Sequence, residues 1–186
     1  MMKIRQHRKQ PELLHRTLLD CAAQIAIEQG VSAVTIQAVA AAAGVTKGGL
    51  FHHFPSKEKL IEAVFRDQLD QFDAEIERAL TADSGGHGSF TRAYVNVVLQ
   101  LGSDRLMSLS LTVMHDPALS RLWSDWLRGR LDRHRETDAG VELEIVRYAA
   151  DGVWVADICG VDSDLRENRE ILRVRLIDAT KKGSTK

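Results

Sequence analysis

The sequence predicts an all-α protein with two domains, and three observations support this fold class. Only three prolines occur in the 186 residues. Apolar residues recur through most of the chain with the 3.6-residue period of amphipathic helices. Residue types that start and end helices stand at the edges of these periodic segments. With 44% apolar residues, the chain can bury a hydrophobic core, which excludes a fully disordered protein.

The first part of the chain predicts four helices, over about 12–29, 36–43, 47–53 and 57–80. Three of them follow a residue that can accept a hydrogen bond at a helix start: Thr35, Thr46 and Ser56. Gly30 and Gly44 follow the first two and are expected to adopt the left-handed conformation that ends a helix. The apolar residues of the last helix form one continuous stripe: Ile61, Phe65, Leu69, Phe72, Ile76 and Leu80.

After a Gly- and Ser-rich loop at 81–89, we expect further helices over 90–102, 104–115, 117–131, 141–159 and 165–179. Asp116 precedes Pro117 in a good order for a helix start, and Asp164 with Glu167 has capping-box spacing. Within 107–113, apolar residues alternate with Ser and Thr, which is the period of a strand. No second segment alternates to pair with it, so a helix is predicted there.

Charge is distributed unevenly between the two ends of the chain. Residues 1–60 contain eight Lys or Arg against four Asp or Glu, whereas residues 61–186 contain 17 against 22. A basic head on an acidic body suggests a polyanionic partner for the head alone. No secretory signal and no apolar run long enough to span a membrane occurs. Two distant cysteines, Cys21 and Cys159, are typical of free thiols in the cytoplasm.

The first three predicted helices have the plan of a helix-turn-helix, in which a short helix enters the major groove of DNA. The predicted recognition helix contains two adjacent glycines, Gly48 and Gly49. Each glycine costs about 1 kcal/mol relative to alanine inside a helix. A backbone that approaches DNA closely gives a reason to keep them.

The stretch from Val34-Thr35-Ile36 through Ala40 and Gly44-Val45 to Leu50-Phe51-His52-His53-Phe54, Lys57 and Leu60 resembles the TetR family of bacterial transcriptional regulators. The segment Ala149-Ala150-Asp151-Gly152-Val153-Trp154 is similar to the corresponding helix of short, multidrug-sensing members. The resemblance implies an N-terminal DNA-binding domain, 1–56, and a helical ligand-binding and dimerisation domain, 57–186, with 57–80 as the connecting helix. It also implies a homodimer that binds a pseudo-palindromic operator and is released by a small molecule.

By position, the resemblance assigns DNA-binding roles to eight residues: Thr35, Thr46, Lys47, Gly48, Gly49, His52, His53 and Lys57. The two Thr would contact phosphates at helix N-termini. Lys47 and the glycines would face base edges with His52 beside them, whereas His53 and Lys57 would bind the DNA backbone. Many members have Tyr where this chain has Phe51, so that phosphate bond is lost and Phe51 is expected only to pack. Four basic residues could add a DNA-binding arm: Lys3, Arg5, Arg8 and Lys9.

The candidate ligand-binding residues lie in the body of the chain: Trp123, Trp126, Asp151 and Trp154. Aromatic side chains with a few polar anchors are typical of a small-molecule site, and a carboxylate near aromatic rings suits a cationic amphipathic ligand. The alternatives are core packing for the tryptophans and a salt bridge for Asp151 and its helix neighbour Asp157. We therefore expect a hydrophobic or cationic amphipathic ligand between the 57–80 helix and the tryptophan-bearing helices.

Other functions remain open alternatives. The adjacent His52 and His53 could bind a metal, but neighbouring positions on a helix point about 100° apart, so DNA contact or packing is favoured and no metal or cofactor is predicted. Cys21 is expected to be a small core residue, and Cys159 is a weak redox candidate. A constitutive DNA-binding protein and a small cytosolic helical enzyme are the rival classes, although no nucleophile–base spacing supports catalysis. Repression is favoured over activation only by the habit of the family.

Overall fold

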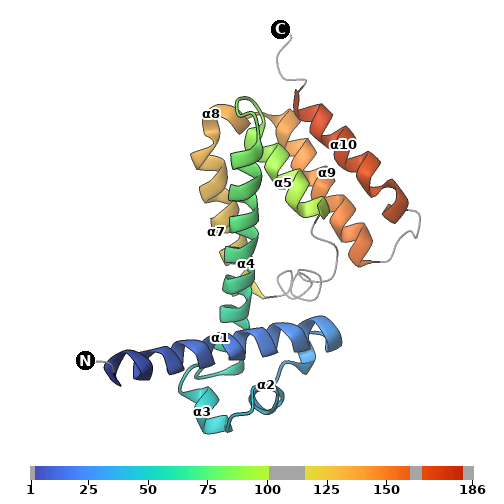
Figure 1. Cartoon of the computed structure of the whole chain (residues 1–186). Coiled ribbons are helices and arrows are strands. Elements are labelled where there is room, and N and C mark those ends of the chain that lie inside the picture. Colours follow the sequence, from blue (N-terminus) through green and yellow to red (C-terminus); the bar gives the residue numbers. More distant parts are fainter. Residues whose placement is uncertain (1–2, 101–115, 160–164, 182–186) are drawn as a thin grey trace. The chain divides into compact units, whose positions relative to one another are not determined.

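The computed structural model describes residues 3–100, 116–159 and 165–181 (Figure 1). All regular secondary structure in these ranges is helical, and no strand occurs there, which confirms the predicted all-α class. The elements are α1 (Lys3–Gln29), the 3-10 turn η1 (Val31–Ala33), α2 (Ile36–Ala42), α3 (Lys47–Phe51), α4 (Lys57–Ala82), α5 (Ser89–Gln100), α7 (Pro117–Arg133), α8 (Arg135–Asp138), α9 (Val141–Ile158) and α10 (Leu165–Lys181).

The predicted helix bounds agree with the structure to within two residues at both ends, apart from the start of the first helix. The prediction that this helix begins near residue 12 is wrong, because α1 begins at Lys3 and contains Pro11. Proline lacks a backbone N–H and removes one helical hydrogen bond, but the Lys, Arg and Gln residues before it are good helix formers. The predictions for 104–115, for the Asp164 cap, and for the side chains of Asp157, Lys3, Arg5, Arg8 and Lys9 lie outside the described residues.

The described chain packs as two compact units. The N-terminal unit comprises 3–69 and 116–120, and the C-terminal unit comprises 70–100, 121–159 and 165–181. The division therefore falls within α4, whereas the domain boundary predicted from the sequence lies at the start of that helix.

The core of the N-terminal unit forms where α1, α2, α3 and the start of α4 meet. Its fully buried side chains include Leu18, Ala22, Val39, Leu50 and Leu60. They recur at helical spacing on the inner face of each helix, as the sequence pattern indicates. Cys21 on α1 is only half-buried, so it lies at the edge of this core. Burial raises the pKa of its thiol, and the charge of Asp20 adds to that effect.

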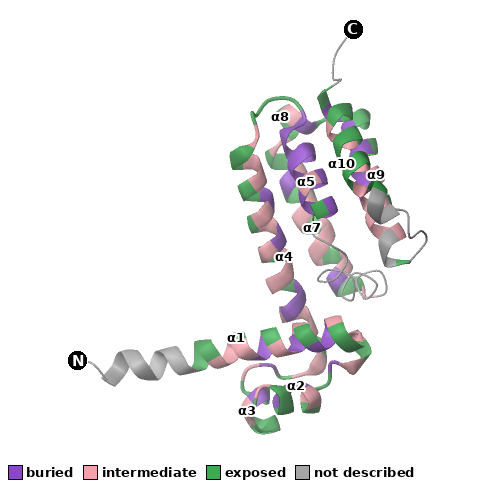
Figure 2. Cartoon of the chain, turned by 45° about the vertical axis from the view of Figure 1, so that its right-hand side comes forward, coloured by how far each residue is buried: buried purple, intermediate pink, exposed green. Residues whose placement is uncertain are grey.

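The C-terminal unit is built around α5, which packs against α8, α9 and α10. Ten of its 12 residues are buried, and it is the most continuously buried helix in Figure 2. A glycine turn with three left-handed residues, Gly85, Gly86 and Gly88, leads into it. Arg92 holds this turn, since its guanidinium binds Asp83 and the carbonyl oxygens of His87 and Gly85.

Candidate DNA interface and regulatory region

Two threonine caps define the turn between α2 and α3. The Thr35 hydroxyl accepts a hydrogen bond from the amide of Ala38 (3.0 Å), and the Thr46 hydroxyl accepts one from the amide of Gly49 (3.1 Å). Between the two helices, Gly44 has a φ of 67°, in the left-handed region. Both predicted caps and the predicted helix-ending glycine are therefore present. Each threonine keeps its own O–H free to donate, because the hydroxyl oxygen acts only as an acceptor in the cap.

The short helix α3 has one buried residue, Leu50, which is 0% exposed and anchors the helix to the core. Lys47, Gly48 and Phe51 are exposed, and so is His52, which follows as the C-cap residue. Most of the surface of α3 is therefore exposed and makes no contribution to the core of this unit.

Neither glycine of α3 is required by the local conformation. Gly48 and Gly49 both have negative φ, unlike the turn glycines. A Cβ atom added at Gly48 would meet only the Thr46 hydroxyl oxygen, at 3.9 Å, and one added at Gly49 would lie at 3.5 Å from the same atom. These are ordinary van der Waals distances, so alanine would fit at either position. The reason for two glycines therefore lies outside the contacts of this unit.

His53 and Lys57 lie where α3 meets α4. The His53 ring is half-buried and lies 5.9 Å from His15 of α1, which in turn lies 4.8 Å from the buried Phe54. The Lys57 ammonium donates to the carbonyl oxygen of Ser32 (3.4 Å). Both basic side chains are thus partly held by the protein. The contact of His15 with these rings was not predicted, because it joins residues almost forty positions apart.

Phe51 differs from the expectation that it only packs. Its side chain is 47% exposed, although the adjacent Leu50 is fully buried. A five-residue helix can send only one side into the core, and Leu50 occupies that side. The expectation for Phe51 is therefore wrong.

Two of the predicted ligand-binding residues come together in the C-terminal unit. The rings of Trp123 and Trp126 lie 5.1 Å apart, and both contact Phe72 of α4, at 5.9 and 5.2 Å. The Trp126 indole N–H donates to the carboxylate of Asp73 (2.5 Å). Trp154 on α9 is half-buried and makes no ring contact with this pair within the described part of the chain. Phe72 also contacts Tyr94 (6.1 Å), whose hydroxyl binds Asp151, so three of the four predicted residues are linked through Phe72 and Tyr94, and Trp154 is not part of these ring contacts.

Asp151, the fourth predicted ligand residue, accepts a hydrogen bond from the Tyr94 hydroxyl (2.6 Å). Tyr94 is 1% exposed. Burial raises the pKa of Asp151, while the Tyr94 hydrogen bond and the positive charge of Arg147 act in the opposite direction. Burial also raises the pKa of Tyr94 well above its usual value, and the Asp151 charge adds to this. The sequence analysis left a salt bridge open as the alternative role of Asp151. Arg147 acts on Asp151 through its charge, but the direct hydrogen-bond partner of Asp151 is the neutral Tyr94 hydroxyl, so this alternative holds only in part.

A buried polar network around Asp138 was not predicted from the sequence. Its carboxylate accepts hydrogen bonds from the amides of Phe90 (3.1 Å) and Thr91 (2.7 Å), and from the Thr91 hydroxyl (2.7 Å). Asp138 thereby caps the start of α5 from a position 47 residues further along the chain. The Arg147 guanidinium donates to the same Thr91 hydroxyl (2.8 Å). Burial lowers the pKa of Arg147, whereas nearby Asp138 acts in the opposite direction.

Another buried charge, Arg130, joins α7 to α4 within the C-terminal unit. It is 4% exposed and pairs with the carboxylates of Asp73 and Glu77. Sequence periodicity assigns apolar residues to the buried face of a helix, so it does not indicate a buried arginine. Two carboxylates compensate its charge, which is the condition under which burial of a guanidinium is tolerated.

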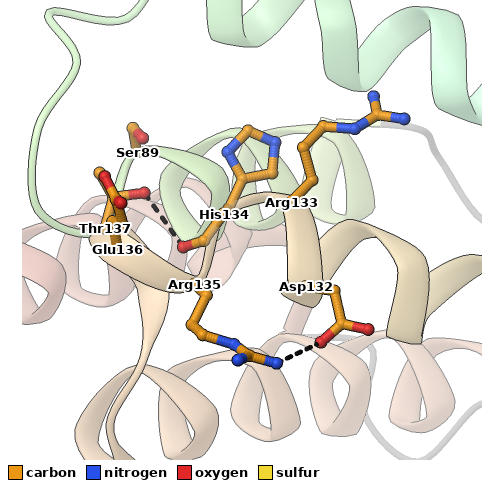
Figure 3. Close-up of a pocket in the computed structure, with 7 residues that line it drawn as sticks. All are labelled: Ser89, Asp132, Arg133, His134, Arg135, Glu136 and Thr137. Carbon is orange, nitrogen blue, oxygen red and sulfur yellow. Dashed lines mark hydrogen bonds and ion pairs between the residues drawn. The ribbon is translucent and has the colours of Figure 1, made fainter.

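A polar pocket of about 400 Å³ lies beside the junction of α7 and α8 (Figure 3). It is lined by Ser89 and the continuous segment 132–137. The His134 ring stacks on Phe90 at 5.1 Å, and its Nε2 atom is buried without a hydrogen-bond partner in the described structure. None of the four residues predicted to bind a ligand lines this pocket.

Within the described residues, no cluster of three or more potential metal ligands is found, and no helix has both the length and the apolarity needed to cross a membrane.

Two sequence families match the chain. Residues 18–64 match the bacterial regulatory proteins of the tetR family, and residues 88–181 match the tetracyclin repressor-like C-terminal domain. The chain is 28% identical over 163 residues to the HTH-type transcriptional repressor KstR2 of Mycolicibacterium smegmatis, with 79% of each chain covered. It is also 28% identical over 158 residues to the HTH-type transcriptional regulator BetI of Escherichia coli O157:H7, covering 75% of this chain and 80% of BetI.

Solved structures share the same fold. The multidrug binding protein EbrR complexed with malachite green is similar with a TM-score of 0.69 and 19% identity, over 89% of this chain and 97% of EbrR. The fatty acid degradation regulator FadR from Bacillus halodurans gives a TM-score of 0.66 at 18% identity, over 88% and 94% of the two chains. With the two family matches and the capped α2–turn–α3 segment, these findings show that the chain belongs to the TetR family of bacterial transcriptional regulators.

Proposed function

We propose that the protein acts as a homodimer that binds a pseudo-palindromic operator through α3 of each protomer and leaves it when a small molecule enters the C-terminal unit. The observation that carries this proposal is the outer face of α3. It is fixed by two threonine caps and by one buried anchor, Leu50, and it presents Lys47 and two glycines that the fold does not need. In a helix-turn-helix, such a face enters the major groove.

The eight predicted residues take two kinds of role in this proposal. Lys47, Gly48, Gly49 and His52 face the bases, because they form or flank the outer face of α3. Thr35, Thr46, His53 and Lys57 bind phosphates around it. The free O–H of each threonine and the charge of Lys57 are suited to phosphate oxygens, which hold a protein in register on the duplex.

Dimerisation is supported by an apolar surface on α9 and α10. Val141, Ile145 and Tyr148 are spaced by four and three residues, so they lie on one face of α9, and they are between 59% and 63% exposed. On α10, Ile171 and Val174 are 58% and 44% exposed. Contiguous exposed apolar side chains mark an interaction surface. Two copies of this helix pair would form a four-helix interface of the kind that closes symmetric dimers.

A lipophilic cation is the proposed class of ligand. Asp151 is a half-buried carboxylate whose direct partner, Tyr94, is uncharged. A positively charged aromatic molecule would add a direct counter-charge to the more distant one of Arg147 and would suit the rings of the same unit. EbrR, a relative in fold, is complexed with malachite green in one structure and with ethidium in another, and both dyes are aromatic cations.

The DNA-binding step is tested with Lys47→Ala. A base or phosphate contact at this position is worth about 1–3 kcal/mol, so operator affinity should fall by roughly fivefold to 150-fold at matched salt. Lys181→Ala is the matched control, because Lys181 is an exposed lysine of the C-terminal unit that pairs with Asp178. Unchanged affinity of Lys47→Ala would contradict the proposed role of α3.

The ligand step is tested by titrating the protein with ethidium or with a neutral aromatic compound and following its tryptophan fluorescence. Each titration is done with and without operator DNA. All three tryptophans lie beyond residue 120, so the signal reports on the body of the chain. Asp151→Asn should weaken binding of the cation and leave the neutral compound unaffected. By linkage, the cation should bind more weakly when operator is present. Equal binding in both conditions would favour the constitutive DNA-binding alternative.

The proposed role is not enzymatic, because the similar proteins KstR2 and BetI are transcriptional regulators. The proposed location is the cytoplasm, because the proposed partner of the basic N-terminal residues 1–60 is operator DNA. A search for turnover of any ligand that the titration identifies would test the enzymatic alternative.

A further inference from the structure

The recognition helix carries an aromatic ring on its surface. Phe51 is 47% exposed, while Leu50 and Phe54 on either side of it in the sequence are 0% and 3% exposed. An exposed phenylalanine contributes little to the core of the unit, and it keeps apolar area in water until something covers it.

The position of Phe51 on α3 places it on the face proposed to meet the bases. Lys47 precedes it by four residues and Gly48 by three, and residues with these spacings are neighbours on one helix surface. Gly48 has no side chain, and a Cβ atom there would meet only the Thr46 oxygen at 3.9 Å. The helix surface at Gly48 is therefore open, next to a Phe51 side chain that is itself 47% exposed.

The chemistry of the ring limits what it can recognise. Phenylalanine has no hydrogen-bond donor or acceptor, so it cannot bind a phosphate oxygen or a polar base edge. Among the groups that base pairs present in the major groove, the apolar one is the C5-methyl group of thymine. Lys47 beside it carries the donors needed for acceptor atoms in the groove.

We propose that Phe51 is a specificity-determining residue that recognises one thymine in each half of the operator through its C5-methyl group. The proposal rests on the proposed function of α3 as the recognition helix, and it names one base that this helix recognises. Phe51 selects thymine over cytosine at this position because cytosine lacks the methyl group, and Lys47 contacts a neighbouring base or phosphate.

The experiment separates the methyl group from the rest of the base. An operator is selected from a random duplex library with the full-length protein, and each thymine is then replaced in turn by deoxyuridine. Deoxyuridine keeps every hydrogen-bonding group of thymine and lacks only the methyl. Removal of one buried methyl group should weaken binding by about fourfold, and symmetric removal in both half-sites by about fifteenfold. We expect this loss at one symmetry-related pair of positions.

The variants assign the methyl contact to Phe51. Phe51→Ala should bind the thymine and deoxyuridine operators equally, and Phe51→Leu should keep a smaller preference for thymine. Lys47→Ala serves as the control, since it should bind both operators more weakly and keep the full thymine preference. Circular dichroism verifies that each variant is folded.

Two results would overturn the proposal at different levels. If wild type binds a selected operator with no loss at any deoxyuridine, or if Phe51→Ala keeps the same loss, Phe51 does not recognise thymine although α3 still binds DNA. If no duplex is selected at all, the proposed function fails and the role of Phe51 fails with it.

Discussion

The glycines of α3 show how a single residue can serve binding at the expense of stability. Gly48→Ala adds a methyl group that fits the local structure and removes the entropic cost of glycine in a helix. The free energy of unfolding should therefore rise by about 0.5–1 kcal/mol, measured by urea denaturation. Operator affinity should fall, because the added methyl group lies on the face that approaches the bases.

Gly129→Ala is the matched control for this prediction. Gly129 lies inside α7, is exposed, and has no atom within 4 Å of an added Cβ. The same gain in stability is expected there without any loss of DNA binding. If Gly48→Ala binds the operator as tightly as wild type, close approach of the backbone is not the reason for this glycine.

Asp151 provides a prediction about pH. Its pKa is raised in the folded state by burial, so between about 3.8 and the folded-state value the native protein binds more protons than the unfolded chain. The contribution of this group to stability therefore decreases as the pH rises through that interval, and the loss is complete above the folded-state pKa. Asp151→Asn should raise the free energy of unfolding at pH 7 and flatten its decrease with pH, because the amide oxygen can still accept the Tyr94 hydrogen bond.

The pKa of Asp73 is shifted in the opposite direction to that of Asp151, so Asp73 serves as the control for the pH dependence of stability. Burial would raise the pKa of Asp73, but the hydrogen bonds from Arg130 and Trp126 outweigh burial and lower it. Its stabilisation is present above the unfolded-state pKa and is lost as the pH falls through the folded-state value. Asp73→Asn should therefore destabilise the protein at pH 7. Chemical denaturation of the three proteins from about pH 2 to pH 8 measures both signs, and parallel curves for Asp151→Asn and wild type would contradict the assignment.

At the scale of an element, the start of α5 depends on Asp138. Two backbone amides and the Thr91 hydroxyl use its carboxylate, and all of these groups are buried. Asp138→Ala leaves them without an acceptor and should lower the free energy of unfolding by about 3 kcal/mol.

Asp116→Ala gives a matched comparison, because Asp116 caps α7 by accepting from Ala118 (2.8 Å) in an exposed setting. Loss of an exposed cap should cost only about 1 kcal/mol. Equal destabilisation by the two variants, measured by thermal or urea unfolding, would show that the buried network adds nothing to an ordinary cap.

The elements also show what the sequence alone can predict. Apart from the start of α1, helix bounds and the caps at Thr35 and Thr46 were predicted correctly because they depend on residues within a few positions. The four-residue helix α8, the cap supplied by Asp138 and the burial of Arg130 were missed. These features depend on contacts between residues far apart in the sequence: Asp138 and Thr91 are 47 positions apart, and Arg130 and Asp73 are 57 positions apart. Local periodicity contains no signal for such contacts. The exposure of Phe51 was missed because residue type alone suggests burial.

At the scale of the whole molecule, the exposed apolar face of α9 and α10 should control assembly. Ile145→Glu places a charge in the middle of this face, and burying an unpaired charge in an interface is costly. The variant should sediment as a monomer at micromolar concentration where wild type is a dimer. It should also lose operator affinity, because a dimer binds two half-sites at once.

Leu13→Glu is the control for the charge itself, since Leu13 is 69% exposed on α1 and lies away from this face in the sequence. It should leave the sedimentation coefficient unchanged. A monomeric wild type would contradict the dimer, and a dimeric Ile145→Glu would place its interface elsewhere.

The single anchor of α3 has a consequence for how this protein can change over time. Because Leu50 alone ties the helix to the core, positions 47, 48, 51 and 52 can be substituted at little cost to folding. Most mutations there would alter the preferred DNA sequence and leave the dimer and its ligand response intact. Duplicated copies of the gene could therefore acquire new operators in a few steps, and a library randomised at these four positions offers a practical route to regulators with orthogonal DNA specificity.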